Sequence, residues 1–328
     1  MTVQEKIIIL FNQEHELTAK EISTKLLVSK QMVHLVLKKL TEKKLIEKLG
    51  RTPKTVYRLS KKTSEPDESI IDYEIDEKSK VFLKENFLMV TETGNLLDGV
   101  NAFNQWCIKR NQPLLKTIGE YIKTKEKYSS YYDKNGTIDG TKKLLKTYGE
   151  KTYLNNVYYL DFYAIERFGK TRLGTLLHFA KQGQNRYLMN IMMKEVNEKI
   201  NHFIKINKID AIGYVPPTIR REVQVMKFIK EYLNVTLPII DIKKISGIIP
   251  IPQKSLSKLD DRIKNAENTF AVTDQRNFNK VLLIDDAIGS GSTLNQIAEK
   301  IKNKKIAKDI LGLAIVGSFK DFDVITDI

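Results

Sequence analysis

The sequence has very little cysteine, since Cys107 is the only one among 328 residues. A single thiol excludes an internal disulfide and a zinc site built from several cysteines. The chain also lacks an apolar run of membrane-spanning length, and residues 1–5 do not open a signal peptide. We therefore expect a cytoplasmic protein that does not enter the membrane.

Acidic residues are scarce relative to basic ones. The chain has 55 Lys and Arg against 40 Asp and Glu, a net charge of +15, and its isoelectric point is near 9.5. This excess indicates a polyanionic partner, most simply nucleic acid, although a basic surface can also serve solubility. The length is sufficient for two or three domains with a sizeable core.

The most informative stretch is residues 281–293. Four consecutive apolar residues precede Asp285 and Asp286, which is typical of a strand buried in a parallel sheet with two acids at its carboxyl end. Small residues fill 289–293, and the amphipathic run 294–301 begins a helix. Such a loop before a helix N-terminus can bind an anion. Because ionised Asp accepts hydrogen bonds and repels phosphate, we expect a ligand with neighbouring hydroxyls and a phosphate.

This stretch resembles the ribose-5-phosphate signature of type I phosphoribosyltransferases. The resemblance implies that Asp285 and Asp286 hold the ribose 2′- and 3′-hydroxyls of phosphoribosyl pyrophosphate (PRPP) and take part in catalysis. It implies that the 5′-phosphate lies against Ala287, Ile288, Gly289, Ser290, Gly291, Ser292 and Thr293. The alternative is a doubly wound sheet whose strand merely ends in Asp-Asp and turns through Gly.

Residues 158–320 are similar to the ComF-like branch of this family, with Lys181 after the first helix of that region. The other matching residues are Pro252, Gln253, Leu256, Arg262, Asn265 and Phe270. The resemblance implies a mobile lid near Lys243 and Lys244, with Arg262 in catalysis. It also implies that pyrophosphate binds to Arg220 and Arg221, that Gln253 binds PRPP from in or beside the lid, and that Mg²⁺ is held mainly by oxygens of PRPP. The alternative for each of these Lys and Arg side chains is a surface charge. The zinc-binding segment usual in this branch is missing.

Residues 1–62 show three helical patterns followed by strand-like residues around a basic turn. A capping box at Thr18 starts the second helix. In the third, Val33, Leu37 and Leu40 recur at i, i+4 and i+7, which buries one face. This order resembles a winged helix-turn-helix domain.

The same 62 residues hold 14 Lys and Arg against 6 Asp and Glu, so attraction to phosphate should be strong and salt-dependent. The resemblance departs at Leu27, where the turn usually carries Gly. It implies nucleic-acid contacts through Lys30, Gln31, His34, Lys38, Arg51 and Lys54, the first four in the major groove. The alternative is a protein-protein module whose lysines are a solvated face.

Residues 63–79 are acidic and are predicted to be a linker, or else a segment that lies against the basic turn and competes with nucleic acid. Residues 80–157 are predicted to be a helical insert because of apolar spacing at Leu97, Val100, Phe103 and Trp106. Its tyrosines, which would stack on bases or pack in the core, are Tyr128, Tyr131, Tyr132 and Tyr148. Residues 158–328 complete an α/β protein with a doubly wound parallel sheet.

Two functions fit these patterns. The first is a Mg²⁺- and PRPP-dependent phosphoribosyltransferase guided by nucleic acid, which resembles effectors encoded beside bacterial retrons. That resemblance implies antiviral defence, with a toxic enzyme held in check by a reverse transcriptase and its RNA–DNA product. The second resembles the bacterial purine-operon repressor, a PRPP-sensing homo-oligomer without transferase activity. Gly289 stands where hypoxanthine-type enzymes carry an Asp, so purine salvage by that route is disfavoured and the acceptor stays open.

Overall fold

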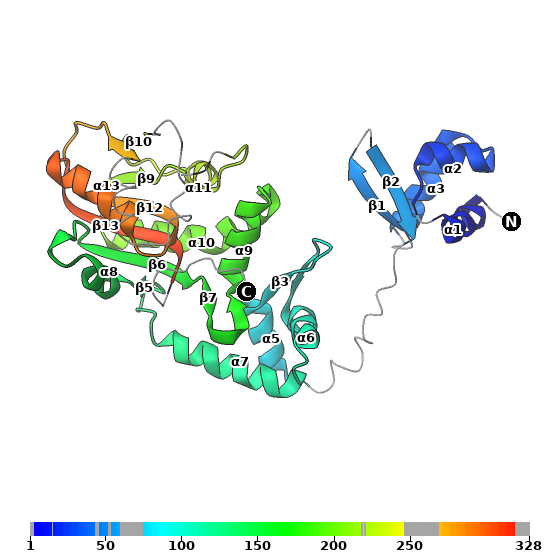
Figure 1. Cartoon of the computed structure of the whole chain (residues 1–328), viewed down its shortest axis with the longest axis horizontal. Helices are drawn as coiled ribbons and strands as arrows, with labels where there is room; N and C mark the ends of the chain where they lie inside the picture. Colours follow the sequence, from blue (N-terminus) through cyan, green and yellow to red (C-terminus); the bar gives the residue numbers. More distant parts are fainter. Residues whose placement is uncertain are drawn as a thin grey trace. The chain divides into compact units, whose positions relative to one another are not determined.

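Figure 1 shows the protein as a computed structural model, which describes residues 3–14, 16–42, 46–51, 54–59, 75–217, 219, 221–245 and 269–318. The chain divides into two compact units, Met1–Glu74 and Ile75–Ile328. Residues 80–157 therefore belong to the same unit as residues 158–318. None of the described helices combines the length and the apolar content needed to cross a bilayer.

The described part of the first unit has three helices and a hairpin: α1 (Val3–Gln13), α2 (Ala19–Leu26), α3 (Lys30–Glu42), β1 (Ile46–Arg51) and β2 (Lys54–Leu59). The two strands are antiparallel. The predicted capping box is confirmed, with Thr18 and Glu21 each accepting a hydrogen bond from the other's backbone or side chain. The predicted buried face of α3 is also confirmed, because Val33, Leu37 and Leu40 are buried against α1 and α2.

The turn after α2 is made by Leu27, which adopts a left-handed conformation with φ of 53°. Its side chain is 91% exposed. An L-residue with a side chain pays a conformational cost in this region of backbone space, which glycine does not. The structure therefore keeps the turn geometry at the position where the sequence departs from Gly.

The second unit begins with a subdomain of helices and short strands. Its elements are α5 (Glu77–Asn86), β3 (Leu88–Val90), β4 (Leu96–Asp98), α6 (Gly99–Lys109), α7 (Leu114–Ser129), β5 (Ile138–Asp139) and α8 (Thr141–Tyr148). The prediction of helix at Leu97 is wrong, because Leu97 pairs with Met89 in the β3–β4 hairpin. The helix starts only at Gly99, whose φ of +61° makes the turn. Aromatic rings of Phe87, Phe103 and Trp106 pack edge-on or stacked beneath it.

A five-stranded sheet forms the centre of this unit. It contains β5 and four longer strands: β6 (Asn156–Phe162), β9 (Ala211–Tyr214), β12 (Phe278–Ile288) and β13 (Ala307–Gly317). The order is β5-β6-β13-β12-β9, with β12 between β13 and β9. All neighbours are parallel except β5, which pairs antiparallel with β6. The predicted parallel sheet is thus a mixed sheet, and the added strand comes from residues 80–157.

Helices cover both faces of the sheet (Figure 1). One face packs against α9 (Arg172–Gln182), α10 (Arg186–Ile206) and α11 (Val225–Leu233) in a single apolar core. The other face packs against α13 (Ser292–Asn303) and α8, where Leu294 and Leu144 contact sheet and turn residues. Smaller elements complete the described part: η1 (Gly149–Lys151), β7 (Ala164–Ile165), η2 (Glu166–Phe168), β8 (Gly169–Lys170), β10 (Ile242–Lys244) and β11 (Phe270–Val272).

Candidate functional site

The connections of the sheet switch faces between two neighbouring strands. The chain leaves β9 for α11 on one face, and it leaves β12 for α13 on the other face. In open α/β sheets, ligands bind outside the carboxyl ends of strands at such a switch point. β9 pairs with β12 only as far as Tyr214 and Ile284. Beyond Ile284, no described strand pairs with this edge of β12.

The two predicted acids lie on this edge. Asp286 is buried, with 7% of its surface exposed, and Asp285 is partly exposed. Asp285 Oδ1 accepts a hydrogen bond from the Asp286 backbone N–H at 2.8 Å. Because side chains alternate along a strand, the two carboxylates leave β12 toward opposite faces. Only a ligand that lies against the strand edge can reach both.

A lysine at the end of α9 pairs with the buried acid. Lys181 Nζ contacts Asp286 Oδ2 in an ion pair whose two side chains are 29% and 10% exposed. The backbone carbonyl of the same lysine accepts a hydrogen bond from Arg221 Nη1 at 2.5 Å, and Arg221 Nη2 donates to Gln182 Oε1 at 3.0 Å. The loop after β9, the end of α9 and the end of β12 are thus joined by one polar network, in which Lys181 contacts the buried acid and Arg221 contacts the end of α9.

The loop between β12 and α13 is shorter than the predicted phosphate loop, residues 287–293. Ala287 and Ile288 still belong to β12 and pair with Val316 and Gly317. Ile288 is buried and Ala287 is partly buried. Because both side chains are apolar, only their backbone can serve a polar ligand. The turn itself is Gly289 to Gly291. Helix α13 then begins with Gly291 as its N-cap, which offers no side-chain cap. The first amide groups of α13 are therefore suited to an anion.

Helix α8 supports this turn, although it comes about 140 residues earlier in the sequence. Tyr148 Oη donates a hydrogen bond to Ser292 Oγ at 2.8 Å, and Ser290 Oγ lies 2.5 Å from Ser292 Oγ. Lys143 Nζ donates to the carbonyl oxygen of Ser318 at 3.0 Å, next to the end of β12. Gly291 has φ of +77°, and a Cβ there would lie 2.7 Å from Leu144 Cδ1. These contacts define the conformation of the turn.

Sequence reasoning missed Lys143, the bond of Tyr148 to Ser292 and a further buried acid, Asp161. The last lies in β6 and accepts hydrogen bonds from Tyr132 Oη at 2.5 Å and from the Phe162 N–H. Burial, followed by the nearby Asp161 carboxylate, raises the pKa of Tyr132 well above its usual range. The tyrosines considered for base stacking therefore include two, Tyr132 and Tyr148, with structural hydrogen bonds. Helical spacing was the only sequence signal for them, and it carries no information about distant partners.

Several predicted residues lie outside the described part of the chain: Arg220, Gln253 and Arg262. The side chains of Arg51 and Lys54 are also outside it, although the backbone of these two residues pairs across the β1–β2 hairpin. Within the described ranges, no group of three His, Cys, Asp or Glu side chains is arranged to hold a metal ion.

In the first unit, the residues predicted to contact nucleic acid share one surface. Lys30, Gln31, His34 and Lys38 are all exposed on α3, opposite the face that packs on α1 and α2. Met32 and Leu35, 47% and 54% exposed, lie among them. The surface can therefore offer cations, an amide and apolar groups to a partner. No family model matches this chain, and no curated protein matches it either.

Proposed function

We propose that unit Ile75–Ile328 binds PRPP at the carboxyl edge of its sheet. The observation that supports this most directly is the position of Asp285 and Asp286, which lie on the unpaired edge of β12 shortly before the N-terminus of α13. The carboxylates would accept hydrogen bonds from the ribose hydroxyls. The α13 amides, together with Ser290 and Thr293, would bind the 5′-phosphate.

The site separates charges as this ligand requires. Ribose hydroxyls need acceptors, whereas both phosphate-bearing ends of PRPP need donors or cations. Lys181 provides a cation at Asp286, and Arg221 provides a second one that donates to the backbone carbonyl of Lys181. A ribose hydroxyl that binds Asp286 competes with Lys181 for the carboxylate. We infer that the lysine then turns its ammonium toward the pyrophosphate.

Transfer would break the bond between ribose C1′ and a pyrophosphate oxygen. The electron pair leaves with pyrophosphate, and a nucleophilic atom of the acceptor forms the new bond to C1′. Positive charge develops on the sugar and negative charge on the leaving group, so fixed cations near the pyrophosphate lower the barrier. Mg²⁺, carried by PRPP, would neutralise part of the same charge.

We further propose that unit Met1–Glu74 is a winged helix-turn-helix that binds DNA through the exposed face of α3. Together the two units suit a toxic effector whose enzyme is directed or restrained by nucleic acid. A PRPP-sensing regulator is the second candidate, favoured by Gly289, which has no side chain to exchange a proton with an acceptor. The regulator would bind a palindromic operator as a homodimer.

Calorimetric titration with PRPP and Mg²⁺ tests the shared part of both candidates. Asp285→Asn and Asp286→Asn should each weaken binding about 10- to 100-fold, because each removes a hydrogen bond to a charged acceptor worth about 1.5 to 3 kcal/mol. Asp309→Asn is the matched control, since Asp309 lies in the same sheet at the amino end of β13 and accepts a bond from Asn155. Equal affinity in all three variants would refute the site.

Pyrophosphate release then separates the two candidates. An enzyme should release pyrophosphate from PRPP when nucleobases, nucleotides or nucleic acid are supplied as acceptors, and Asp286→Asn should abolish the release. A regulator should bind PRPP without release and should change its affinity for a specific duplex when PRPP is added. Duplex binding that depends on salt but not on sequence or PRPP would argue against the regulator.

A further inference from the structure

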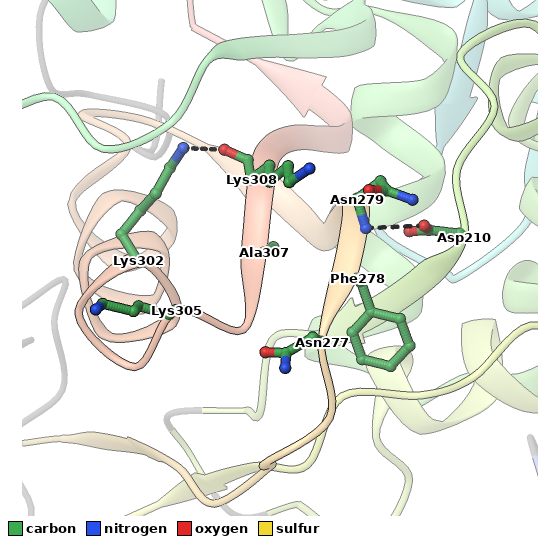
Figure 2. Close-up of a pocket in the computed structure, with 8 residues that line it drawn as sticks. All are labelled: Asp210, Asn277, Phe278, Asn279, Lys302, Lys305, Ala307 and Lys308. Atoms are coloured by element: carbon green, nitrogen blue, oxygen red, sulfur yellow. Dashed lines mark hydrogen bonds between the residues drawn. The ribbon is translucent and has the colours of Figure 1, made fainter.

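A second polar surface lies at the opposite edge of the same sheet. Figure 2 shows a pocket of about 720 Å³ where the strands begin. It is formed by the end of α13, the starts of β12 and β13, and the residue before β9. Its lining residues are Asp210, Asn277, Phe278, Asn279, Lys302, Lys305, Ala307 and Lys308. The PRPP site proposed above is at the carboxyl ends of these strands, so this surface is separate from it.

The register of β12 and β13 and the alternation of side chains along a strand place the lysines and asparagines of the pocket on one face of the sheet. Phe278 pairs with Ala307 in the parallel ladder, so the next residues, Asn279 and Lys308, lie side by side. Their side chains leave the sheet on the face opposite to that of Phe278 and Ala307. Asn277 shares that orientation because side chains alternate. This is the face covered by α13, which brings Lys302 and Lys305 to the same place (Figure 2).

The lysines of this pocket are available to an anion. Lys305 and Lys308 are exposed, and within the described part of the chain neither forms an ion pair. Lys302 donates to the backbone carbonyl of Lys308, which leaves two of its three donors. By contrast, Lys304 donates to the Val272 carbonyl at 2.6 Å and so anchors β11. The pocket lysines have no comparable structural role apart from the single bond of Lys302.

The acid in the pocket is already occupied. Asp210 accepts hydrogen bonds from the backbone N–H groups of Asn279 and Lys280, both at 2.9 Å. Its charge still disfavours a phosphate group beside it. The ligand must therefore bring negative charge to the lysines and keep it away from Asp210. A nucleic-acid strand can do this, because its phosphates can contact the lysines while its polar base edges face the asparagine amides and Asp210.

We propose that this surface binds single-stranded nucleic acid, as a second site beyond the one assigned to α3. Lysines contact the backbone phosphates, and Asn277 and Asn279 can both donate to and accept from exposed base edges. In a duplex, base edges lie in grooves, and a protein reads them by inserting a helix or a two-stranded ribbon. The starts of these strands present no such protruding element among the described residues, so exposed bases of a single strand fit better. A single strand bound here would also be held by the unit that carries the PRPP site.

Fluorescence anisotropy with the full-length protein and a labelled oligothymidine tests this assignment. Lys305→Gln/Lys308→Gln removes two cations, and each phosphate contact contributes about 0.7 to the salt slope on single strands. The slope should fall by about 1.4, and affinity at about 0.1 M salt should fall about 25-fold. The matched control is Lys194→Gln/Lys199→Gln, which removes the same charge from two exposed lysines of α10; it should bind normally.

A second pair of variants separates this surface from the first unit. Lys30→Gln/Lys38→Gln should weaken duplex binding and largely spare the single strand, whereas the pocket variant should do the reverse. PRPP affinity should be unchanged in the pocket variant, which also shows that the unit is folded. The proposal fails if the α10 control loses as much affinity, if duplex and single strand weaken equally, or if inorganic phosphate displaces the oligonucleotide at constant ionic strength.

Discussion

Gly291→Ala is the sharpest test of how the turn before α13 is held. Gly291 has φ of +77°, and an added Cβ would lie 2.7 Å from Leu144 Cδ1. Leu144 is 2% exposed, so it has little space to withdraw. The substitution thus meets two independent obstacles, one in the backbone of the turn and one in its packing against α8.

The expected loss follows from these two terms. An L-residue in the left-handed region costs about 1 to 2 kcal/mol, and an overpacked contact costs about 1 to 3 kcal/mol. Replacing glycine also lowers the conformational entropy of the unfolded chain, which raises the free energy of unfolding by about 0.4 to 1 kcal/mol. The free energy of unfolding should therefore fall by about 1 to 5 kcal/mol, and a loss near the middle of this range would move a urea midpoint by about 1 M.

Urea unfolding followed by tryptophan fluorescence measures this loss selectively. Trp106 is the only tryptophan of the chain and is buried in unit Ile75–Ile328, so the signal follows this unit. Gly119→Ala is the control, because Gly119 lies inside α7 with nothing within 4 Å of an added Cβ. It should raise stability by about 0.5 to 1 kcal/mol.

The contact with α8 can be isolated by a double-mutant cycle. Leu144→Ala alone should cost about 2 to 5 kcal/mol through the cavity it leaves. In the Gly291→Ala background it should cost about 1 to 3 kcal/mol less, because the same change relieves the overpacked contact. An unchanged midpoint for Gly291→Ala, or costs that simply add, would refute the packing of α8 on the turn.

Three further predictions concern other parts of the fold. Lys181→Met leaves the carboxylate of Asp286 without its cation and should lower the free energy of unfolding by about 1 to 3 kcal/mol; adding Asp286→Asn should recover most of this in calorimetry, and an uncoupled result would exclude the ion pair. Burial raises the pKa of the Cys107 thiol to about 11, so thiolate is rarer than usual at pH 8 and Ellman's reagent should react slowly until urea unfolds the chain; fast reaction in the native protein would contradict this. Leu27→Asn should stabilise unit Met1–Glu74 by up to about 1 kcal/mol, since Asn tolerates a positive φ better, and circular dichroism melting that shows a loss would place the strain elsewhere.

Local patterns were sufficient for the elements whose partners are near in sequence. The apolar run before Asp285 became the buried core of β12, because four consecutive apolar residues suit a strand covered on both faces. The capping box at Thr18 and the buried face of α3 were also readable, since capping and helical burial repeat within a few residues. In contrast, Leu97 was misassigned, because short strands and helix starts share apolar spacing and only pairing with Met89 decides between them.

The sequence by itself determined that an acid pair follows the buried core of a strand and precedes a small-residue turn and a helix, and that the chain is strongly basic. Only the tertiary structure decided what surrounds that turn. Lys181 meets Asp286 across 105 residues, Tyr148 meets Ser292 across 144, and β5 adds itself to the sheet. Such contacts depend on the order of the strands in the sheet and on the packing of the helices. The periodicity of a sequence does not indicate which distant residue a side chain will contact. For the same reason, the lysines of the second surface became one site only when the starts of β12 and β13 were brought together.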